Sequence, residues 1–231
     1  MWVYVQRFHY EIHSGIISPS CLRKKKLEAV TLRQKIPALA IFWAIQALTY
    51  FLIPLKFAFE PTLVSYTRVD QAIPFVLWTI VIYVTFYLQI SLMFLLAESR
   101  KALREIFILY FWGGCLLSAF YFLMPTVHHY PNPVPECCGV LEWIFLKIRY
   151  LDVAANQFPS GHTLFSLIGP FYMLASVRKT KGWLFLIWGL AITASTLTVK
   201  QHNAYDAVAG ISFAAALGYA FGRYYSKPAA V

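Results

Sequence analysis

Charge is scarce in this sequence, and negative charge is the scarcer sign. Only 13% of the 231 residues are charged, with 10 Asp and Glu against 20 Lys and Arg, whereas 59% are hydrophobic. Soluble domains average about 45–50% apolar residues, so the composition argues against a soluble domain and predicts a protein of the bilayer. It also argues against nucleic-acid binding, which needs a soluble basic surface.

Cysteine is rare as well. The four cysteines, Cys21, Cys115, Cys137 and Cys138, follow neither a Cys-x-x-Cys nor a Cys/His metal spacing. Neither a zinc site nor a disulfide framework is therefore indicated. The adjacent pair Cys137-Cys138 is interpreted as ordinary thiols, with a vicinal disulfide or a lipidated pair as the alternatives.

Long apolar runs are abundant instead. A transmembrane helix needs about 20 apolar residues, with 17 to 25 tolerated. Six runs of roughly this length predict an all-α, six-helix membrane bundle. They are Ile36 to Leu55, Ile73 to Ala97, Ile106 to Pro125, Gly161 to Val177, Gly182 to Val199 and Asn203 to Gly222. The last three are rich in Gly, Ala and Ser, which allow close helix approach.

The positions of Lys and Arg predict the orientation. Fifteen of the twenty lie before the first span, in the second-to-third and fourth-to-fifth loops, or in the tail. Basic residues favour the cytoplasmic side, so both termini are expected there. The predicted organisation is a basic cytoplasmic segment at 1–35, a membrane catalytic domain at 36–225 and a short tail at 226–231.

The longest predicted outer connection runs from Thr126 to Ser160. Connections this long are usually functional or disordered. Within it, Val140 to Leu151 mixes aliphatic and aromatic residues with a few charges, which indicates a helix at the membrane interface.

Pro159-Ser160-Gly161-His162 opens the fourth predicted span. Pro159 cannot continue a preceding helix, Ser160 is a good N-cap, and Gly161 permits close approach to its backbone amide. A helix N-terminus binds anions such as phosphate, and His162 stands in the same turn. The alternative is a capped helix whose histidine only sits at the interface.

His202 and Asp206 form the second element, at the start of the sixth predicted span. Residues four apart are neighbours on one helical face. A carboxylate that holds one imidazole nitrogen leaves the other basic and directed, as a nucleophile or base requires. The alternative is a structural pair at a helix start.

Topology brings the two elements together, because the fourth and sixth spans begin on the same outer side. The combination favours phosphoryl transfer, with His202 attacking phosphorus, Asp206 orienting it and His162 protonating the leaving alkoxide. Ser160, Gly161, Lys200, Gln201, Arg149 and Tyr130 are the candidate substrate-binding residues. His128 and His129 adjoin the site and are weaker candidates for phosphate or metal. Without carboxylates at ligand spacing, no metal is expected.

These motifs resemble the type 2 phosphatidic acid phosphatase superfamily, whose second motif reads Pro-Ser-Gly-His and whose third ends in His-x-x-x-Asp. The resemblance implies six spans, no cofactor, an outward-facing site and a phosphohistidine at His202, with Asp206 assisting and His162 as general acid. Asp70 to Phe75 and Leu123 to Thr126 look like the branch of inositol phosphorylceramide synthases and related bacterial proteins.

The chain also departs from the family pattern. The first motif, a Lys followed six residues later by Arg-Pro, is absent, and Ser195-Thr196 stands where the third motif usually opens with Ser-Arg. Lys200, Lys147 and Arg149 are the nearby outer-side substitutes, of which Lys200 adjoins His202. Fewer cations favour a singly charged diester over a doubly charged monoester.

Three hypotheses follow. The first is a lipid phosphate or diphosphate phosphatase that is an integral membrane protein with its site on the extracytoplasmic side. The second is a phospholipid or sphingolipid head-group phosphotransferase. The third is a non-catalytic lipid-binding protein, in which His202→Ala would change no activity.

Overall fold

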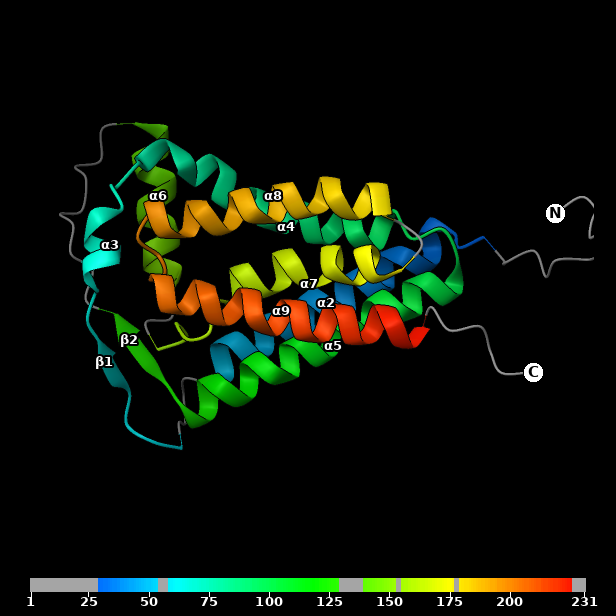
Figure 1. Ribbon diagram of the computed structural model, residues 1–231, viewed down its shortest axis with the longest axis horizontal. Helices are drawn as coiled ribbons and strands as arrows, with labels where there is room; N and C mark the ends of the chain where they lie inside the picture. Colours follow the sequence, from blue (N-terminus) through cyan, green and yellow to red (C-terminus); the bar gives the residue numbers. More distant parts are fainter. Residues whose placement is uncertain (1–28, 54–57, 129–138, 153–154, 177–178, 226–231) are drawn as a thin grey trace, which may run out of the picture.

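The computed structural model describes residues 29–53, 58–128, 139–152, 155–176 and 179–225. These residues form a helical bundle with one small strand pair (Figure 1). The helices are α2 (Leu32–Leu52), α3 (Arg68–Ala72), α4 (Ile80–Leu95), α5 (Arg100–Leu123), α6 (Val140–Leu151), α7 (Gly161–Ala175), α8 (Lys179–Thr198) and α9 (Ala204–Tyr225), with a 3-10 turn η2 (Leu77–Thr79) and strands β1 (Thr62–Val64) and β2 (Thr126–His128).

Four helical segments within the described residues are long and apolar enough to cross a membrane: Leu32–Leu52, Leu77–Leu95, Arg100–Leu123 and Ala204–Tyr225. Many of their large apolar side chains are exposed, as expected where lipid replaces water as the solvent. The prediction of an all-α membrane protein is confirmed. The remaining two predicted spans correspond to α7 and α8, and the count of six stays a prediction.

The boundaries differ from those expected. The predicted second span, from Ile73, begins only at Leu77, because Ile73 ends α3 with an extended backbone and Pro74 follows it. The third begins earlier than predicted, at Arg100, since the Ser99 hydroxyl accepts the Ala102 amide and caps the helix. Helix α6 has the predicted bounds, and its position at a membrane surface remains a prediction.

Helix α7 is the centre of the bundle and packs against α4, α5, α8 and α9. Glycines permit its closest contacts. A Cβ at Gly189 would lie 2.5 Å from the Ser166 carbonyl oxygen, and one at Gly218 would lie 2.6 Å from that of Ile168. Larger residues would therefore push α8 and α9 away from α7, and the small residues fix the helix spacing.

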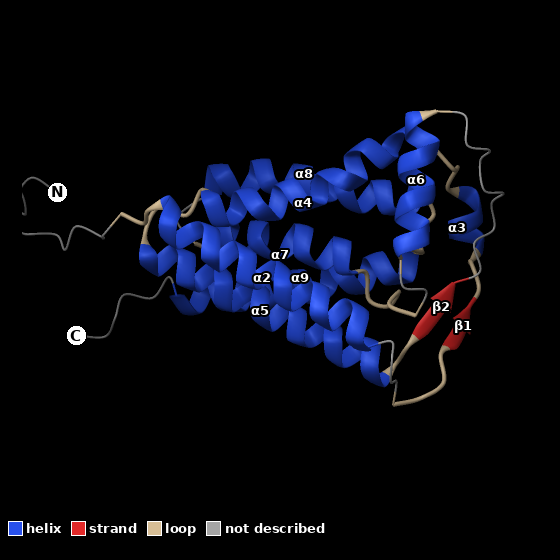
Figure 2. Cartoon of the chain, turned by 180° about the vertical axis from the view of Figure 1, so that it is seen from behind, coloured by secondary structure: helices blue, strands red, loops and turns tan. Residues whose placement is uncertain are grey.

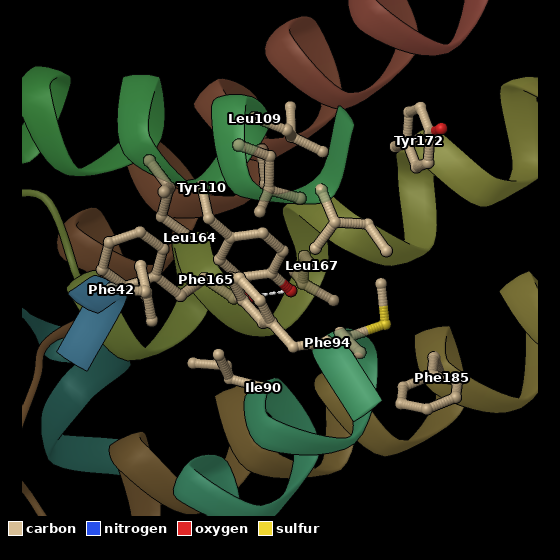
Figure 3. Close-up of a cluster of buried hydrophobic side chains, with 14 of the residues drawn as sticks. Phe42, Ile90, Phe94, Leu109, Tyr110, Leu164, Phe165, Leu167, Tyr172 and Phe185 are labelled. Carbon is tan, nitrogen blue, oxygen red and sulfur yellow. Dashed lines mark hydrogen bonds between the residues drawn. The ribbon is translucent and has the colours of Figure 1, made fainter. Parts of the chain in front are cut away.

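An aromatic cluster fills the middle of the bundle (Figure 3). The ring centroid of Tyr110 lies 5.6 Å from that of Phe42, 5.7 Å from that of Phe94 and 5.9 Å from that of Phe165. The centroids of Phe42 and Phe94 are 5.3 Å apart. The Tyr110 hydroxyl donates to the Phe165 carbonyl oxygen at 3.1 Å, which satisfies the one polar group of the cluster. The cluster holds α2, α4, α5 and α7 in a fixed arrangement.

One end of the bundle is covered by the strand pair, α3 and α6, with α6 crossing the long helices (Figures 1 and 2). The strands are parallel, with Val64 opposite His128. The sequence pattern does not predict this strand pair. The starts of α7 and α9 lie at the covered end, whereas the start of α2 and the end of α9 lie at the other.

Candidate functional site

The N-terminus of α7 is held against α9 by a backbone hydrogen bond. The Ser160 amide donates to the Asp206 carbonyl oxygen at 3.1 Å, and the Ser160 hydroxyl accepts the Thr163 amide at 3.3 Å as the N-cap. The Tyr121 hydroxyl donates to the Pro159 carbonyl oxygen at 3.1 Å. A Cβ at Gly161 would lie 3.0 Å from that hydroxyl, so a glycine keeps this turn compact.

His162 lies between two aromatic rings of α4. Its ring centroid is 4.4 Å from those of both Tyr83 and Phe86. Its Nε2 is buried and has no hydrogen-bond partner among the described residues. The ring centroids of His162 and His202 are 5.8 Å apart, so the two imidazoles are near neighbours.

His202 and Asp206 are connected as their spacing suggested, with His202 Nδ1 3.3 Å from Asp206 Oδ2. The same oxygen accepts the Asn203 amide at 3.1 Å, and the Asn203 side-chain oxygen accepts the Asp206 amide at 2.9 Å. Asn203 therefore caps α9 and holds the carboxylate. With Nδ1 engaged, Nε2 is the His202 nitrogen left for chemistry.

His128 makes the shortest contact to Asp206: its Nε2 lies 2.7 Å from Oδ2. The residue is 4% exposed, at the end of β2, with Nδ1 3.4 Å from the Val64 carbonyl oxygen. Burial alone would lower the pKa of His128, but its hydrogen bond to Asp206 and the negative charge there raise the pKa above its ordinary value. One carboxylate thus serves two histidines. The sequence singled out His128 only as a phosphate or metal candidate, because the contact spans 78 residues.

Lys200 lies beside His202 in sequence, but its ammonium points to α3. Its Nζ donates to the carbonyl oxygens of Asp70 at 2.6 Å and Ile73 at 2.5 Å. Its backbone has a φ of 59°, a left-handed conformation unusual for a side chain of this size. Burial lowers the pKa of Lys200, partly offset by the charge of Asp70. Asp70 in turn accepts the Ala204 amide at 2.6 Å, so this contact closes the loop before α9. The substrate-binding role expected for Lys200 stays a prediction.

The other predicted substrate residues are dispersed. Gln201 is 1% exposed, and neither polar atom of its side chain has a partner among the described residues. Arg149 lies in the last turn of α6, 5.3 Å from the Phe145 ring centroid. Burial raises the pKa of Tyr66, as do the charges of two nearby carboxylates, and the Arg149 guanidinium opposes that rise. The charge of Arg149 therefore acts near the covered end of the bundle. Tyr130 lies outside the described residues.

A cavity of about 310 Å³ adjoins the histidines. Its walls come from α2, α4, α5, α6 and α7, and they are mostly aromatic or aliphatic. His162, His202 and Gly161 line it, as does Asp152 at the end of α6, but no Lys or Arg is among the described residues that line it. Elsewhere in the described parts of the chain, no group of three or more His, Cys, Asp or Glu has a metal-site arrangement.

Residues 126–229 match the family model of the PAP2 superfamily. This segment is slightly less than half of the chain, and it contains Ser160, Gly161, His162, His202 and Asp206. The match supports the resemblance seen in the motifs, but it does not support the narrower resemblance to the branch of inositol phosphorylceramide synthases.

No curated protein and no solved structure matches the chain. Proteins of the PAP2 superfamily are generally phosphoric ester hydrolases or phosphotransferases. The match to residues 126–229 and the apolar helices together support a membrane protein of the lipid phosphatase or phosphotransferase type.

Proposed function

We propose that this protein is a metal-independent phosphatase of lipid phosphates or diphosphates that works through a phosphohistidine on His202. The observation that carries the proposal is that His162 and His202 line one cavity with their ring centroids 5.8 Å apart, while the Asp206 carboxylate holds His202 Nδ1. Nucleophile, orienting group and acid are the three parts that such a transfer requires.

In the proposed first step, the lone pair of His202 Nε2 attacks phosphorus and the bond from phosphorus to the lipid oxygen breaks. The Nε2 proton of His162 passes to the leaving alkoxide. Water then attacks the phosphohistidine, the P–N bond breaks, and His162 takes up a proton from the water. A positioned acid or base of this kind typically contributes about 10²–10⁴ in rate.

The start of α7 is the proposed phosphate cradle. The first amides of a helix have no partner within the helix, and the helix dipole adds positive charge there. The Ser160 hydroxyl is occupied by the Thr163 amide, so the backbone at Gly161 and His162 is the proposed contact. The rings of Tyr83 and Phe86 pack against His162 and hold its imidazole at the start of α7.

The proposal includes six spans, both termini on the cytoplasmic side and an extracytoplasmic site. It is supported by basic residues near the start of α2, the starts of α5 and α8 and the end of α9, which lie at the bundle end opposite the strand pair. Basic residues at one end are the usual mark of the cytoplasmic side.

The test is phosphate release by purified protein from phosphatidate, lysophosphatidate and a polyprenyl diphosphate. His202→Asn should abolish turnover, whereas Ser212→Ala, on the exposed side of α9, should not change it. Substrate labelled at phosphorus should leave its label on His202 after rapid quenching. Label on another residue, or full activity in His202→Asn, would contradict the mechanism.

A head-group phosphotransferase is the second candidate, and the absence of Lys and Arg from the described cavity lining favours it. A phosphodiester carries one negative charge and depends less on cations than a monoester. The same phosphohistidine would form, with an alcohol in place of water as the acceptor. Release of no phosphate from any monoester, together with exchange of a phospholipid head group onto an added lipid alcohol, would establish this candidate over the first.

A further inference from the structure

We propose that the cavity holds a second polar subsite, formed by Asp152, Asn156 and Tyr50, which binds an ammonium group of the molecule whose phosphate lies at the histidines. This inference rests on the proposed function and narrows its substrate class. The three residues come from the end of α6, the segment before α7, and α2, and all three line the same cavity as His162 and His202.

The subsite is an ordered group of side chains. The Tyr50 hydroxyl donates to Asp152 Oδ1, and Gln157 Nε2 donates to Asp152 Oδ2 at 3.3 Å. Asn156 Nδ2 donates to the Tyr50 carbonyl oxygen at 2.8 Å, which fixes the orientation of the Asn156 amide. A carboxylate oriented in this way can receive a ligand without first ordering its side chain.

Asn156 supplies an independent sign of a ligand. Its side chain is 3% exposed, and its Oδ1 has no hydrogen-bond partner among the described residues. Buried acceptors without a donor are uncommon in native proteins. Because Asn156 lines the cavity, an N–H donor on a bound molecule would satisfy this oxygen.

The charge and shape of the cavity determine the kind of donor. Asp152 repels phosphate, so it cannot be part of the phosphate cradle, and no Lys or Arg shares the described lining. The rings of Trp43, Tyr83 and Tyr87 form part of the wall of the same cavity. Aromatic faces with a carboxylate are the surroundings in which proteins hold ammonium groups. A zwitterion, with phosphate at one pole and ammonium at the other, matches this cavity.

Two kinds of lipid carry such a pair of charges. In a long-chain base phosphate the amine is on the lipid backbone, and in phosphatidylethanolamine it is in the head group. The ammonium a few bonds from phosphorus is common to both. The cavity volume of about 310 Å³ is at the lower end of ligand sites, which suits the polar part of a lipid with the chains outside.

The test compares kcat/KM for matched substrates in wild-type protein and Asp152→Asn. Sphingosine 1-phosphate is compared with phosphatidate, and phosphatidylethanolamine with phosphatidylglycerol, each diester with an acceptor alcohol. We expect wild-type protein to prefer the ammonium-bearing member of a pair, and Asp152→Asn to lower kcat/KM for that member by about tenfold or more. The ammonium-free member should change by less than about threefold. Which pair responds identifies the source of the ammonium.

Two further variants control for folding and for loss of charge. Asn156→Ala keeps the carboxylate and should weaken the preference in the same direction. Glu98→Gln removes an exposed carboxylate that pairs with Lys181 at the other end of the bundle, and it should leave the preference unchanged. Equal loss for both members of each pair in Asp152→Asn, or a preference for a polyol head group that this variant removes, would overturn the ammonium subsite.

Binding separates this inference from the proposed mechanism. In His202→Asn, thermal stabilisation by sphingosine 1-phosphate is compared with that by phosphatidate, with and without Asp152→Asn. One outcome is that stabilisation is selective and depends on Asp152, while wild-type protein turns over no lipid. This outcome would support the subsite and refute the phosphatase. Turnover in wild-type protein without selectivity would refute the subsite alone.

Discussion

His128 is expected to act as a positioning residue for the proposed nucleophile. It is not among the described residues that line the cavity, and in the proposed mechanism it does not touch the substrate. Its Nε2 is 2.7 Å from the Asp206 oxygen that also holds His202. His128→Leu removes this donor while largely preserving apolar volume. The carboxylate would then lose its shortest hydrogen bond and its fixed direction towards His202.

The magnitude follows from the type of hydrogen bond. A hydrogen bond to a charged group contributes about 1.5–3 kcal/mol, and 1.36 kcal/mol corresponds to a tenfold change in rate. If the whole contribution is felt at His202, kcat in His128→Leu falls by about 10- to 150-fold. KM should change by less than about threefold, because His128 does not contact the cavity. His128→Gln keeps a neutral donor of similar reach and should recover most of the loss.

The pH profile distinguishes positioning from simple packing. His128 contacts Asp206, Asn203 and Tyr66, and the charge of Asp70 also acts on it. The pKa of His128 is raised, so its imidazolium persists at pH values above the ordinary pKa of histidine. As pH falls through that pKa, the imidazolium neutralises the carboxylate and His202 becomes a weaker nucleophile.

The assay is kcat and KM for phosphatidate in detergent micelles from pH 5 to 9. The acid limb of kcat should contain a His128 component in wild-type protein that His128→Gln lacks. Wild-type kcat in His128→Leu would refute the reasoning. So would an acid limb of the same shape in wild-type protein and His128→Gln.

Three other outcomes are expected. Lys200→Met should lower the thermal midpoint, because the carbonyl oxygens of Asp70 and Ile73 lose their ammonium donor, and hydrogen bonds to a charged group contribute about 1.5–3 kcal/mol. KM should change less than about twofold; raised KM at an unchanged midpoint would instead identify a substrate cation. Gly210→Ala would place a Cβ 2.8 Å from Thr163 Cβ, separating α7 from α9 and lowering kcat about tenfold or more; unchanged kcat would contradict this. Because the pKa of His128 is raised on folding, its ionisation stabilises the fold fully below about pH 6.5. This stabilisation is lost as pH rises through the folded pKa. The difference in thermal midpoint between wild-type protein and His128→Leu should therefore shrink between about pH 6 and 9.

The long apolar helices of the fold were predictable from the sequence. Apolar runs of membrane length predicted the long helices, and Ser160 predicted the start of α7 as its N-cap. Their ends were predicted less well, because a run of hydrophobic letters does not reveal the extended residue Ile73 before Pro74 or the polar first turns of α5. Hydrophobicity identifies the part of a helix that can lie in lipid, not where its hydrogen bonds begin.

The strand pair and the His128 contact were not predictable in the same way. Strands of three residues have no useful periodicity, and β1 and β2 pair across a distance of 64 residues in sequence, as Thr62 with Thr126. Lys200 shows the converse: adjacency to His202 suggested a shared ligand, but the left-handed backbone at Lys200 turns its ammonium to α3. Proximity in sequence therefore indicated the region of the site and not the partner of each side chain.

In the proposed function, reaction type and substrate choice depend on different parts of this chain. The segment that matches the PAP2 superfamily, 126–229, contains the proposed nucleophile, acid and carboxylate, whereas most of the aromatic wall of the cavity comes from α2 and α4, outside that segment. A family match can therefore support the reaction type while leaving the substrate open. Substitutions at wall residues such as Trp43 and Tyr87 should change which lipid is preferred without moving the ionisations of kcat. Substitutions at His128 should do the reverse, because His128 contacts Asp206 and is not among the described residues that line the cavity.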